Sequence, residues 1–136
     1  MMFNKIEHIG IAVKDLKEAV KEFELLSEQK CYKTEIVESE SVKTAFIQIG
    51  ESKIELLEAT NSSSPIAKFL DKKGPGFHHI AFDVYNIEDE ISRLKKNGFV
   101  LIHETSKFGA DNKKIAFLHP KSTSGVLVEI CQERKE

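Results

Sequence analysis

Hydrophobic and polar residues alternate over residues 76–84, in the middle of the chain, and this alternation predicts a β-strand. One face of the strand is aliphatic and aromatic, and the other carries His79 followed two positions later by a small residue, Ala81. Residues 6–13 repeat the pattern near the N-terminus, where His8 is followed by a glycine opposite an aliphatic stripe. In both strands the small residue leaves room beside the imidazole.

The first half of the chain predicts the element order β-α-β-β-β. Asp15 can cap the helix, because its carboxylate can accept hydrogen bonds from the free N–H groups of the first turn. The polar segment 38–41 predicts a turn or loop, and Gly50 predicts a tight connection. The expected elements are a strand over residues 5–13, a helix over residues 16–26, and strands over residues 32–37, 42–49 and 53–59.

The second half repeats this order after a linker over residues 60–76. The linker is expected to contain a short helix, residues 66–71, with Ser64 as its cap. Gly98 predicts the end of the second long helix, and residues 132–136 form a charged tail that is expected to fray. The expected elements are a strand over residues 77–84, a helix over residues 87–97, and strands over residues 99–103, 113–118 and 126–131, with a loop over residues 105–112.

The two halves match element for element, as modules over residues 5–59 and 77–131 of a single domain spanning residues 1–136. One βαβββ unit cannot cover its own sheet, whereas two units can if their sheets meet edge to edge about a pseudo-twofold axis. The sequence therefore predicts an α+β fold built of two tandem βαβββ modules.

Composition excludes some classes of function. The chain has 136 residues, of which 40% are hydrophobic and 31% charged, with a formal net charge of −2. Acidic and basic residues are mixed, so there is no basic stripe for nucleic acid, and no apolar run approaches the length of a membrane span. Two cysteines, Cys31 and Cys131, are too few for a disulfide framework and fit no zinc motif. They are expected to be reduced thiols in a cytoplasmic protein.

Each half contributes one histidine from its first strand and one glutamate from its last: His8 and Glu55, then His79 and Glu129. All four fall on the less apolar face of their strands, where a carboxylate would be out of place in a packed core. Two imidazoles and two carboxylates suit a divalent ion of intermediate hardness, namely Co²⁺, Ni²⁺, Mn²⁺, Fe²⁺ or Zn²⁺. Two cis positions of an octahedron would stay open for a substrate with two oxygens, whose enolate the ion would stabilise.

An alternative explanation treats these residues as ordinary strand histidines and solvent-facing glutamates, and it is the better one for any single residue. The coincidence of all four at equivalent positions of the repeat favours the metal site. Other candidates carry a weaker signal. Gln48 lies on the strand beside Glu55 and can face either way. Lys121 and Ser122, in a turn after His119, could hold a phosphate or simply be solvated, and Lys113 with its neighbouring lysine is expected to be a solvated pair.

Several segments together resemble the vicinal-oxygen-chelate superfamily, which includes glyoxalase I, extradiol dioxygenases and the bleomycin- and fosfomycin-resistance proteins. The segments are His8-Ile9-Gly10-Ile11-Ala12-Val13, Ile54-Glu55-Leu56-Leu57-Glu58, Phe77-His78-His79-Ile80-Ala81-Phe82 and Gly125-Val126-Leu127-Val128-Glu129. Two more specific phrases, residues 64–70 and residues 116–122, are most similar to the methylmalonyl-CoA epimerase family. The resemblance covers nearly the whole chain.

The resemblance implies a cupped, barrel-like mixed sheet around a divalent metal, with His8, Glu55, His79 and Glu129 at the ligand positions and Co²⁺ favoured. It implies an acyl-CoA thioester substrate, epimerised between its (2R) and (2S) forms, and a homodimer. The proton at C2 is acidic because it lies between a thioester and a carboxylate. Carboxylates on opposite faces, Glu129 among them, would remove and return this proton.

The sequence departs from the epimerase family at one sensitive place. A Glu-Gln-Gly-Val or Glu-His-Gly-Val phrase usually precedes the third strand, and its glutamate is a proposed base. Counting back from Glu55 puts that glutamate at Ser39. Either a local shift brings Glu38 or Glu40 into place, or the second base is absent.

Two other functions stay open from the sequence. A glyoxalase I would also transfer a proton at a metal centre. A non-catalytic binding module of the resistance-protein type would sequester a small molecule and would usually lack the four ligands.

Overall fold

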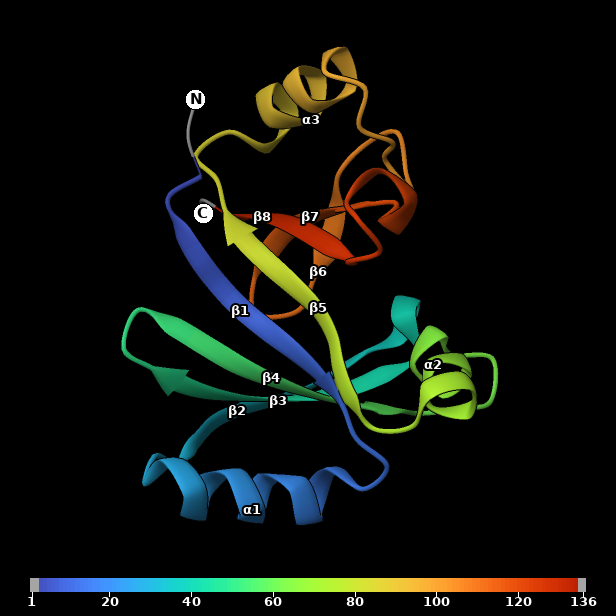
Figure 1. Ribbon diagram of the computed structural model, residues 1–136. Coiled ribbons are helices and arrows are strands. Elements are labelled where there is room, and N and C mark those ends of the chain that lie inside the picture. Colours follow the sequence, from blue (N-terminus) through green and yellow to red (C-terminus); the bar gives the residue numbers. More distant parts are fainter. Residues whose placement is uncertain (1–2, 135–136) are drawn as a thin grey trace. The chain divides into compact units, whose positions relative to one another are not determined.

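The computed structural model describes residues 3–134 of the chain, and these form two compact units. The N-terminal unit comprises His8–His78, and the C-terminal unit comprises residues 3–7 with residues 79–134. The elements in chain order are β1 (Lys5–Ala12), α1 (Leu16–Ser27), β2 (Cys31–Val37), the 3₁₀ turn η1 (Glu38–Glu40), β3 (Val42–Ile49), β4 (Ser52–Ala59), α2 (Pro65–Lys73), β5 (Gly76–Asp83), α3 (Ile87–Lys96), β6 (Lys107–Gly109), β7 (Lys113–Leu118), the 3₁₀ turn η2 (Pro120–Ser122) and β8 (Val128–Glu133) (Figure 1).

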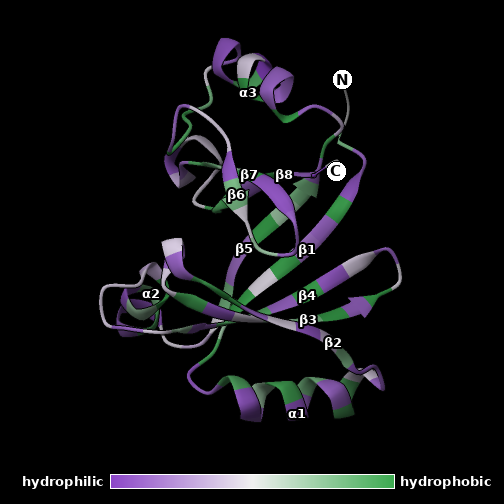
Figure 2. Ribbon diagram, turned by 180° about the vertical axis from the view of Figure 1, so that it is seen from behind, coloured by the Kyte–Doolittle hydropathy of each residue, from purple (hydrophilic) through white to green (hydrophobic). Residues whose placement is uncertain are grey.

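In the N-terminal unit, the strands lie in the order β2-β3-β4-β1, with α1 along one face of the sheet (Figure 1). Hydrophobic and hydrophilic residues alternate around α1 (Figure 2), so one side of the helix packs on the sheet while the other stays hydrated. Leu16 and Ala19 of α1 pack against Ala45 and Leu56 of the strands. The short helix α2 packs Ile66 on the opposite face of the sheet, and Ser64 caps it as predicted.

In the C-terminal unit, the strands lie in the order β5-β8-β7-β6. The helix α3 packs its buried residues Ile87, Ile91 and Leu94 against Ala116 and Ile130 of the sheet. Each unit therefore covers one sheet face with its own long helix and builds a separate apolar core there. Within residues 3–134, no helix combines the length and apolar character needed to cross a membrane.

The two long helices begin in the same way. Asp15 accepts a hydrogen bond from Glu18 N at 3.1 Å, and Asn86 accepts one from Asp89 N at 3.1 Å. A side chain from the last strand of each module binds one more free N–H group: Leu16 N donates to Glu58 Oε1 and Ile87 N donates to Gln132 Oε1, each at 2.7 Å. These bonds satisfy N–H groups that the helix cannot satisfy itself, and they tie the end of each first strand to the last strand.

The first and last strands of each module also pair in parallel. Gly10 of β1 lies opposite Glu55 of β4, and Ala81 of β5 lies opposite Glu129 of β8. The small residue after each histidine is therefore the direct neighbour of a glutamate. The space it leaves lets the glutamate side chain lean back toward the imidazole.

The prediction of a strand over residues 99–103 is wrong, and the predicted loop over residues 105–112 contains the short strand β6 instead. Only an isolated bridge, Leu101 with Leu118, and two backbone hydrogen bonds join the earlier segment to β7. The reason lies in the next residues. Glu104 pairs with Lys95, and Ser106 donates to Glu88 Oε1 at 2.6 Å, so the residues that follow the bridge bond to side chains of α3.

The other differences from prediction are at element ends. Strand β8 starts two residues later than expected and continues to Glu133, so the first two residues of the predicted tail belong to the strand. The last two residues of that tail, 135 and 136, lie outside the described part of the chain. The α+β class and the two βαβββ modules are confirmed.

Glu90 is a polar residue at a core position of α3. Its side chain is 1% exposed, Oε1 accepts from Arg93 Nε and Nη2 at 3.1 and 2.9 Å, and Oε2 has no hydrogen-bond partner in the described structure. Ala19 occupies the equivalent position of α1, counted from the caps Asp15 and Asn86. Burying a carboxylate oxygen without a partner costs free energy that an apolar side chain would not.

We expect Glu90→Met to stabilise the protein by about 1–3 kcal/mol, because it replaces an unsatisfied buried carboxylate by an apolar side chain of similar volume. Urea unfolding followed by circular dichroism measures this change. Arg93→Ala is the matched control and should destabilise the protein, since it leaves the Glu90 carboxylate without its counter-charge. A Glu90→Met protein less stable than the wild type would contradict the interpretation.

Candidate metal site

In the N-terminal unit, the predicted ligands His8 and Glu55 come together. The Nε2 atom of His8 lies 3.2 Å from Oε1 of Glu55, and both side chains are almost fully buried, at 6% and 7% exposed. Phe46 on β3 lies opposite Glu55 on the other side from β1. The carboxylate thus stands between a small residue and a phenyl ring.

The C-terminal unit builds the same arrangement from His79 and Glu129. Nε2 of His79 lies 3.1 Å from Oε1 of Glu129, with side chains 4% and 6% exposed. Phe117 on β7 lies opposite Glu129, and its ring meets the His79 ring edge-on with centroids 5.7 Å apart. The pseudo-symmetry read from the sequence therefore extends to the atoms of the side chains.

The alternative that these residues are ordinary strand histidines and solvent-facing glutamates is wrong for the glutamates. Glu55 and Glu129 are only 5% and 4% exposed as whole residues. Buried carboxylates occur in proteins where a counter-charge, a hydrogen bond or a metal compensates the loss of hydration. The face that carries His8 and His79 is also the more buried face of its strand.

The geometry of each pair fits a divalent metal ion. Two donor atoms held about 2.1 Å from one ion and at right angles to each other are about 3.0 Å apart. The observed separations of 3.2 and 3.1 Å are close to that value. The chemistry also fits, since neutral imidazole and carboxylate suit divalent ions from Mn²⁺ to Zn²⁺. Donor atoms of His79 and Glu129 lie within 4.8 Å of each other, which is close enough for both to bind one ion.

Gln48, a predicted substrate residue, lies near the end of β3 and is exposed. Its Nε2 donates to Gly50 O at 2.8 Å and to Ser52 O at 3.3 Å. The side chain amide therefore closes the turn between β3 and β4.

Lys121 and Ser122 lie in η2, after β7. Ser122 Oγ donates to His119 O at 2.9 Å and accepts from Val100 N at 3.2 Å, and Lys121 N donates to His119 Nδ1 at 3.1 Å. The hydroxyl of Ser122 thus holds the turn together, while the Lys121 side chain is exposed.

Glu38 and Glu40 flank Ser39 in η1, where Glu38 is exposed and Glu40 is half-buried. Ser41 follows with φ of 53°, in the left-handed region that favours glycine. The family phrase named above has its glycine at this position. The Ser41 backbone thus has the conformation that a glycine at this position of the phrase would favour.

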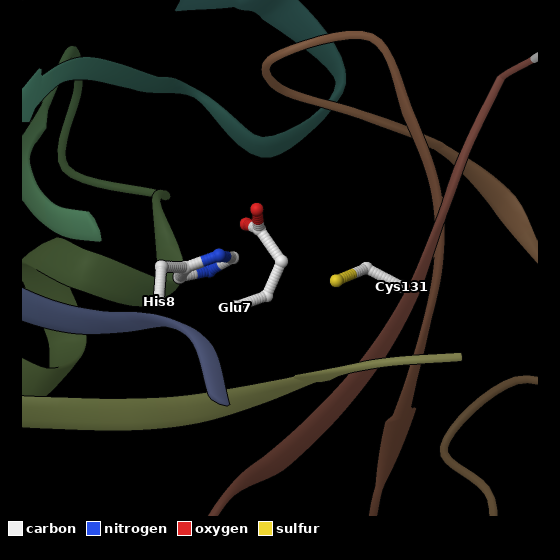
Figure 3. A group of neighbouring side chains, drawn as sticks. All are labelled: Glu7, His8 and Cys131. Atoms are coloured by element: carbon white, nitrogen blue, oxygen red, sulfur yellow. The ribbon is translucent and has the colours of Figure 1, made fainter. Parts of the chain in front are cut away.

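Sequence reasoning missed a second buried charged group, in the C-terminal unit. Lys113, predicted to be solvated, is 7% exposed, and its Nζ lies 3.7 Å from Oε2 of Glu7, which is 2% exposed. Cys131 is fully buried, and its thiol lies within 4.8 Å of the Glu7 carboxylate (Figure 3). The available signal was the position of Lys113, which lies two and four residues before Ile115 and Phe117 and so shares their face of β7.

This group is distinct in chemistry from the His–Glu pairs. The Lys113 ammonium already supplies the positive charge that the Glu7 carboxylate needs, so a metal there would meet a like charge. Burial raises the pKa of the Cys131 thiol, and the neighbouring carboxylates of Glu129 and Glu7 raise it further. The thiol is therefore protonated and a poor metal ligand.

A second missed feature is the ion pair of Lys33 and Glu35 on β2. Lys33 Nζ lies 3.4 Å from Glu35 Oε1, and both side chains are partly accessible, at 37% and 31% exposed. The alternating sequence of β2 puts both residues on one face of the strand. Whether that face is the one that carries Glu55 depends on how β2, β3 and β4 pair, which the sequence does not give.

Comparison with known proteins places these observations in a family. The model of the glyoxalase/bleomycin resistance protein/dioxygenase superfamily matches residues 7–117. An uncharacterized protein of Bacillus subtilis, YqjC, is 40% identical over 131 residues, covering 96% of this chain and 94% of its own. The mitochondrial methylmalonyl-CoA epimerase of Homo sapiens is 37% identical over 129 residues, covering 94% of this chain and 73% of its own.

A solved structure has the same fold. A variant of the Streptomyces coelicolor methylmalonyl-CoA epimerase, in complex with 2-nitronate-propionyl-CoA, matches with a TM-score of 0.94 and 32% identity. The match covers 97% of this chain and 96% of that one.

The two cysteines should differ in reactivity. Cys31 is half-buried and Cys131 is fully buried. We therefore expect a thiol reagent such as DTNB to modify Cys131 at least about 100-fold more slowly than Cys31 in the folded protein. Stopped-flow absorbance on the wild type and on Cys31→Ala measures the two rates, and addition of urea should expose the slow thiol. Equal rates in the folded protein would contradict the burial of Cys131.

Proposed function

The chain belongs to the glyoxalase/bleomycin resistance protein/dioxygenase superfamily, and from this membership we propose that it is a metal-dependent methylmalonyl-CoA epimerase. The observation that carries the proposal is the repeated His–Glu pair, which is buried in each unit with Nε2–Oε1 distances of 3.2 and 3.1 Å. The relatives named as methylmalonyl-CoA epimerases, similar over nearly the whole chain, supply the substrate class.

His8, Glu55, His79 and Glu129 are the ligands of one divalent ion in this proposal. Support comes from the equivalence of the two pairs in register and in burial. Co²⁺ is the ion we favour, with Ni²⁺, Mn²⁺, Zn²⁺ and Fe²⁺ as alternatives. Bound there, the ion would supply Lewis-acid stabilisation of negative charge on the substrate's oxygens.

Proton transfer at C2 falls to carboxylates of this chain. We assign Glu129 to one face of C2, and Glu38 or Glu40, the two carboxylates that flank Ser39, to the other. One carboxylate accepts the C2 proton, the electron pair of the C–H bond moves into the thioester carbonyl, and the other carboxylate returns a proton from the opposite side. Inversion at C2 follows from the use of opposite faces.

The remaining assignments concern substrate and cellular context. Gln48, Lys121 and Ser122 are proposed to contact the acyl-CoA thioester, with the exposed Lys121 directed to a phosphate. The two free cysteines are in keeping with a cytoplasmic protein. A homodimer is proposed as the assembly, by the likeness to the epimerase family.

Hydrogen–deuterium exchange tests the reaction. We expect the metal-loaded protein to convert (2R)- and (2S)-methylmalonyl-CoA into one another in D₂O with one deuterium incorporated at C2, as measured by mass spectrometry and chiral analysis. Propionyl-CoA lacks the carboxylate that makes this proton acidic and should not exchange above background. If no deuterium enters at C2, the epimerase proposal fails, and turnover of a glutathione hemithioacetal would identify a glyoxalase instead.

Metal titration tests whether one ion needs both pairs. Calorimetry with Co²⁺ should give one ion per chain, and either His8→Ala or His79→Ala should weaken that one site by at least about 100-fold, since each removes a ligand. His103→Ala, at an exposed position, is the control and should bind normally. Two ions per chain, with each variant losing one, would show two separate sites. Circular dichroism and the milder His8→Gln variant check that lost binding is not lost folding.

A further inference from the structure

The partly accessible ion pair Lys33–Glu35 lies on the same face of its sheet as the His8–Glu55 pair. Strand pairing establishes this: Lys33 is opposite Phe46, which is in turn opposite Glu55. Paired residues of neighbouring strands project to the same face of a sheet. Lys33 and Glu55 therefore project to one face, with the phenyl ring of Phe46 between them.

Two strand spacings separate Lys33 from the proposed ligand Glu55. Neighbouring strands are about 4.8 Å apart, so the Cα atoms of Lys33 and Glu55 are roughly 10 Å apart across three strands. Phe46 is 1% exposed and intervenes with an apolar ring. The ammonium of Lys33 is held along its own strand by Glu35, at 3.4 Å.

The second module has no equivalent of this ion pair. Phe117 corresponds to Phe46, but β6 is only three residues long and pairs from Lys107 opposite Ile115. Continuing that register would set residue 105 opposite Phe117, and residue 105 lies outside the strands. Among the described residues, a cation directly opposite the aromatic residue is thus a feature of the first module, whereas Lys113, the cation on this face of β7, is buried and paired with Glu7.

We propose that Lys33 is a specificity residue whose ammonium binds the carboxylate of a carboxyl-bearing acyl-CoA thioester, with Glu35 holding the ammonium in position. This inference rests on the proposed function and deepens it. The ligand set is pseudo-symmetric, since each module supplies one imidazole and one carboxylate, so it offers no distinction between the two oxygen-bearing ends of a malonyl group. The two modules differ in their cations: the Lys33 ammonium is partly accessible, whereas Lys113 is buried with Glu7, and this difference sets the direction in which such a group binds.

The chemistry of the pair suits this role. An ammonium has three N–H groups, so Lys33 can bind a substrate carboxylate while Glu35 accepts from it. Hydrogen bonds between ionised groups are the stronger kind and are strengthened further where water is partly excluded. Exposures of 37% and 31% leave the pair within reach of a small ligand.

The test compares two ligands of similar size, malonyl-CoA and propionyl-CoA, in which a carboxylate replaces a methyl group. Calorimetry of the Co²⁺-loaded protein should show malonyl-CoA binding more tightly than propionyl-CoA. Lys33→Met should weaken malonyl-CoA binding about tenfold or more, because a charge-assisted bond is lost, and should change propionyl-CoA binding less than twofold. Lys33→Arg should restore part of the preference. Lys43→Met is the matched control, because Lys43 is exposed on the other face of β3, and it should bind both ligands as the wild type does.

Two results would overturn the inference. One is a Lys33→Met protein that keeps the wild-type preference for malonyl-CoA, and the other is an equal loss of affinity for both ligands, which indicates a structural role. Failure of the proposed function is separate, because it appears as absence of C2 exchange in the wild type. If the wild type shows no exchange at C2 but Lys33→Met still abolishes the preference for malonyl-CoA, the epimerase proposal fails and the carboxylate site stands.

Discussion

Parallel pairing between the first and last strands of each module is the constraint on which the candidate site depends. It sets Gly10 beside Glu55 and Ala81 beside Glu129, and so brings each glutamate within 3.2 Å of a histidine from the other strand. The pairing is reinforced at one end by backbone bonds from Val13 and Val84 to the last strands. A shift of one residue in either register would turn the glutamate to the opposite face, against the helix.

Buried charge is the cost of this arrangement, and each unit compensates it locally. The imidazole beside each glutamate, the proposed metal, and the Lys113 ammonium beside Glu7 all offset carboxylates that would otherwise be unstable away from water. Glu90 is the exception on the other side of the sheet, since one of its oxygens has no partner among the described residues. A buried glutamate therefore lowers stability at Glu90, whereas buried glutamates at positions 55 and 129 serve the proposed metal site.

Departures from symmetry between the modules are as informative as the symmetry itself. The proposed metal ligands, the aromatic neighbours and the helix caps repeat, whereas the edge strand does not. β2 has seven residues and carries the Lys33–Glu35 pair, and β6 has three. The proposed metal would use both imidazole–carboxylate pairs. An asymmetric substrate would use the longer β2. Duplication thus accounts for the two imidazole–carboxylate pairs, and divergence of one strand accounts for the proposed recognition of the carboxylate.

The sequence by itself determined the repeat, the positions of nearly all the strands and helices, and the four candidate ligands, because these depend on local periodicity and on residue types that recur at equal intervals. Only the tertiary structure decided the rest. The segment after Gly98 forms an isolated bridge with β7 and no strand, because the residues that follow bond to side chains of α3, and no local pattern records those bonds. Lys113 is buried because Glu7, distant in the sequence, provides a counter-charge. The pairs His8–Glu55 and His79–Glu129 were chosen by sequence, but their distances were fixed by strand register, which is a property of the folded sheet.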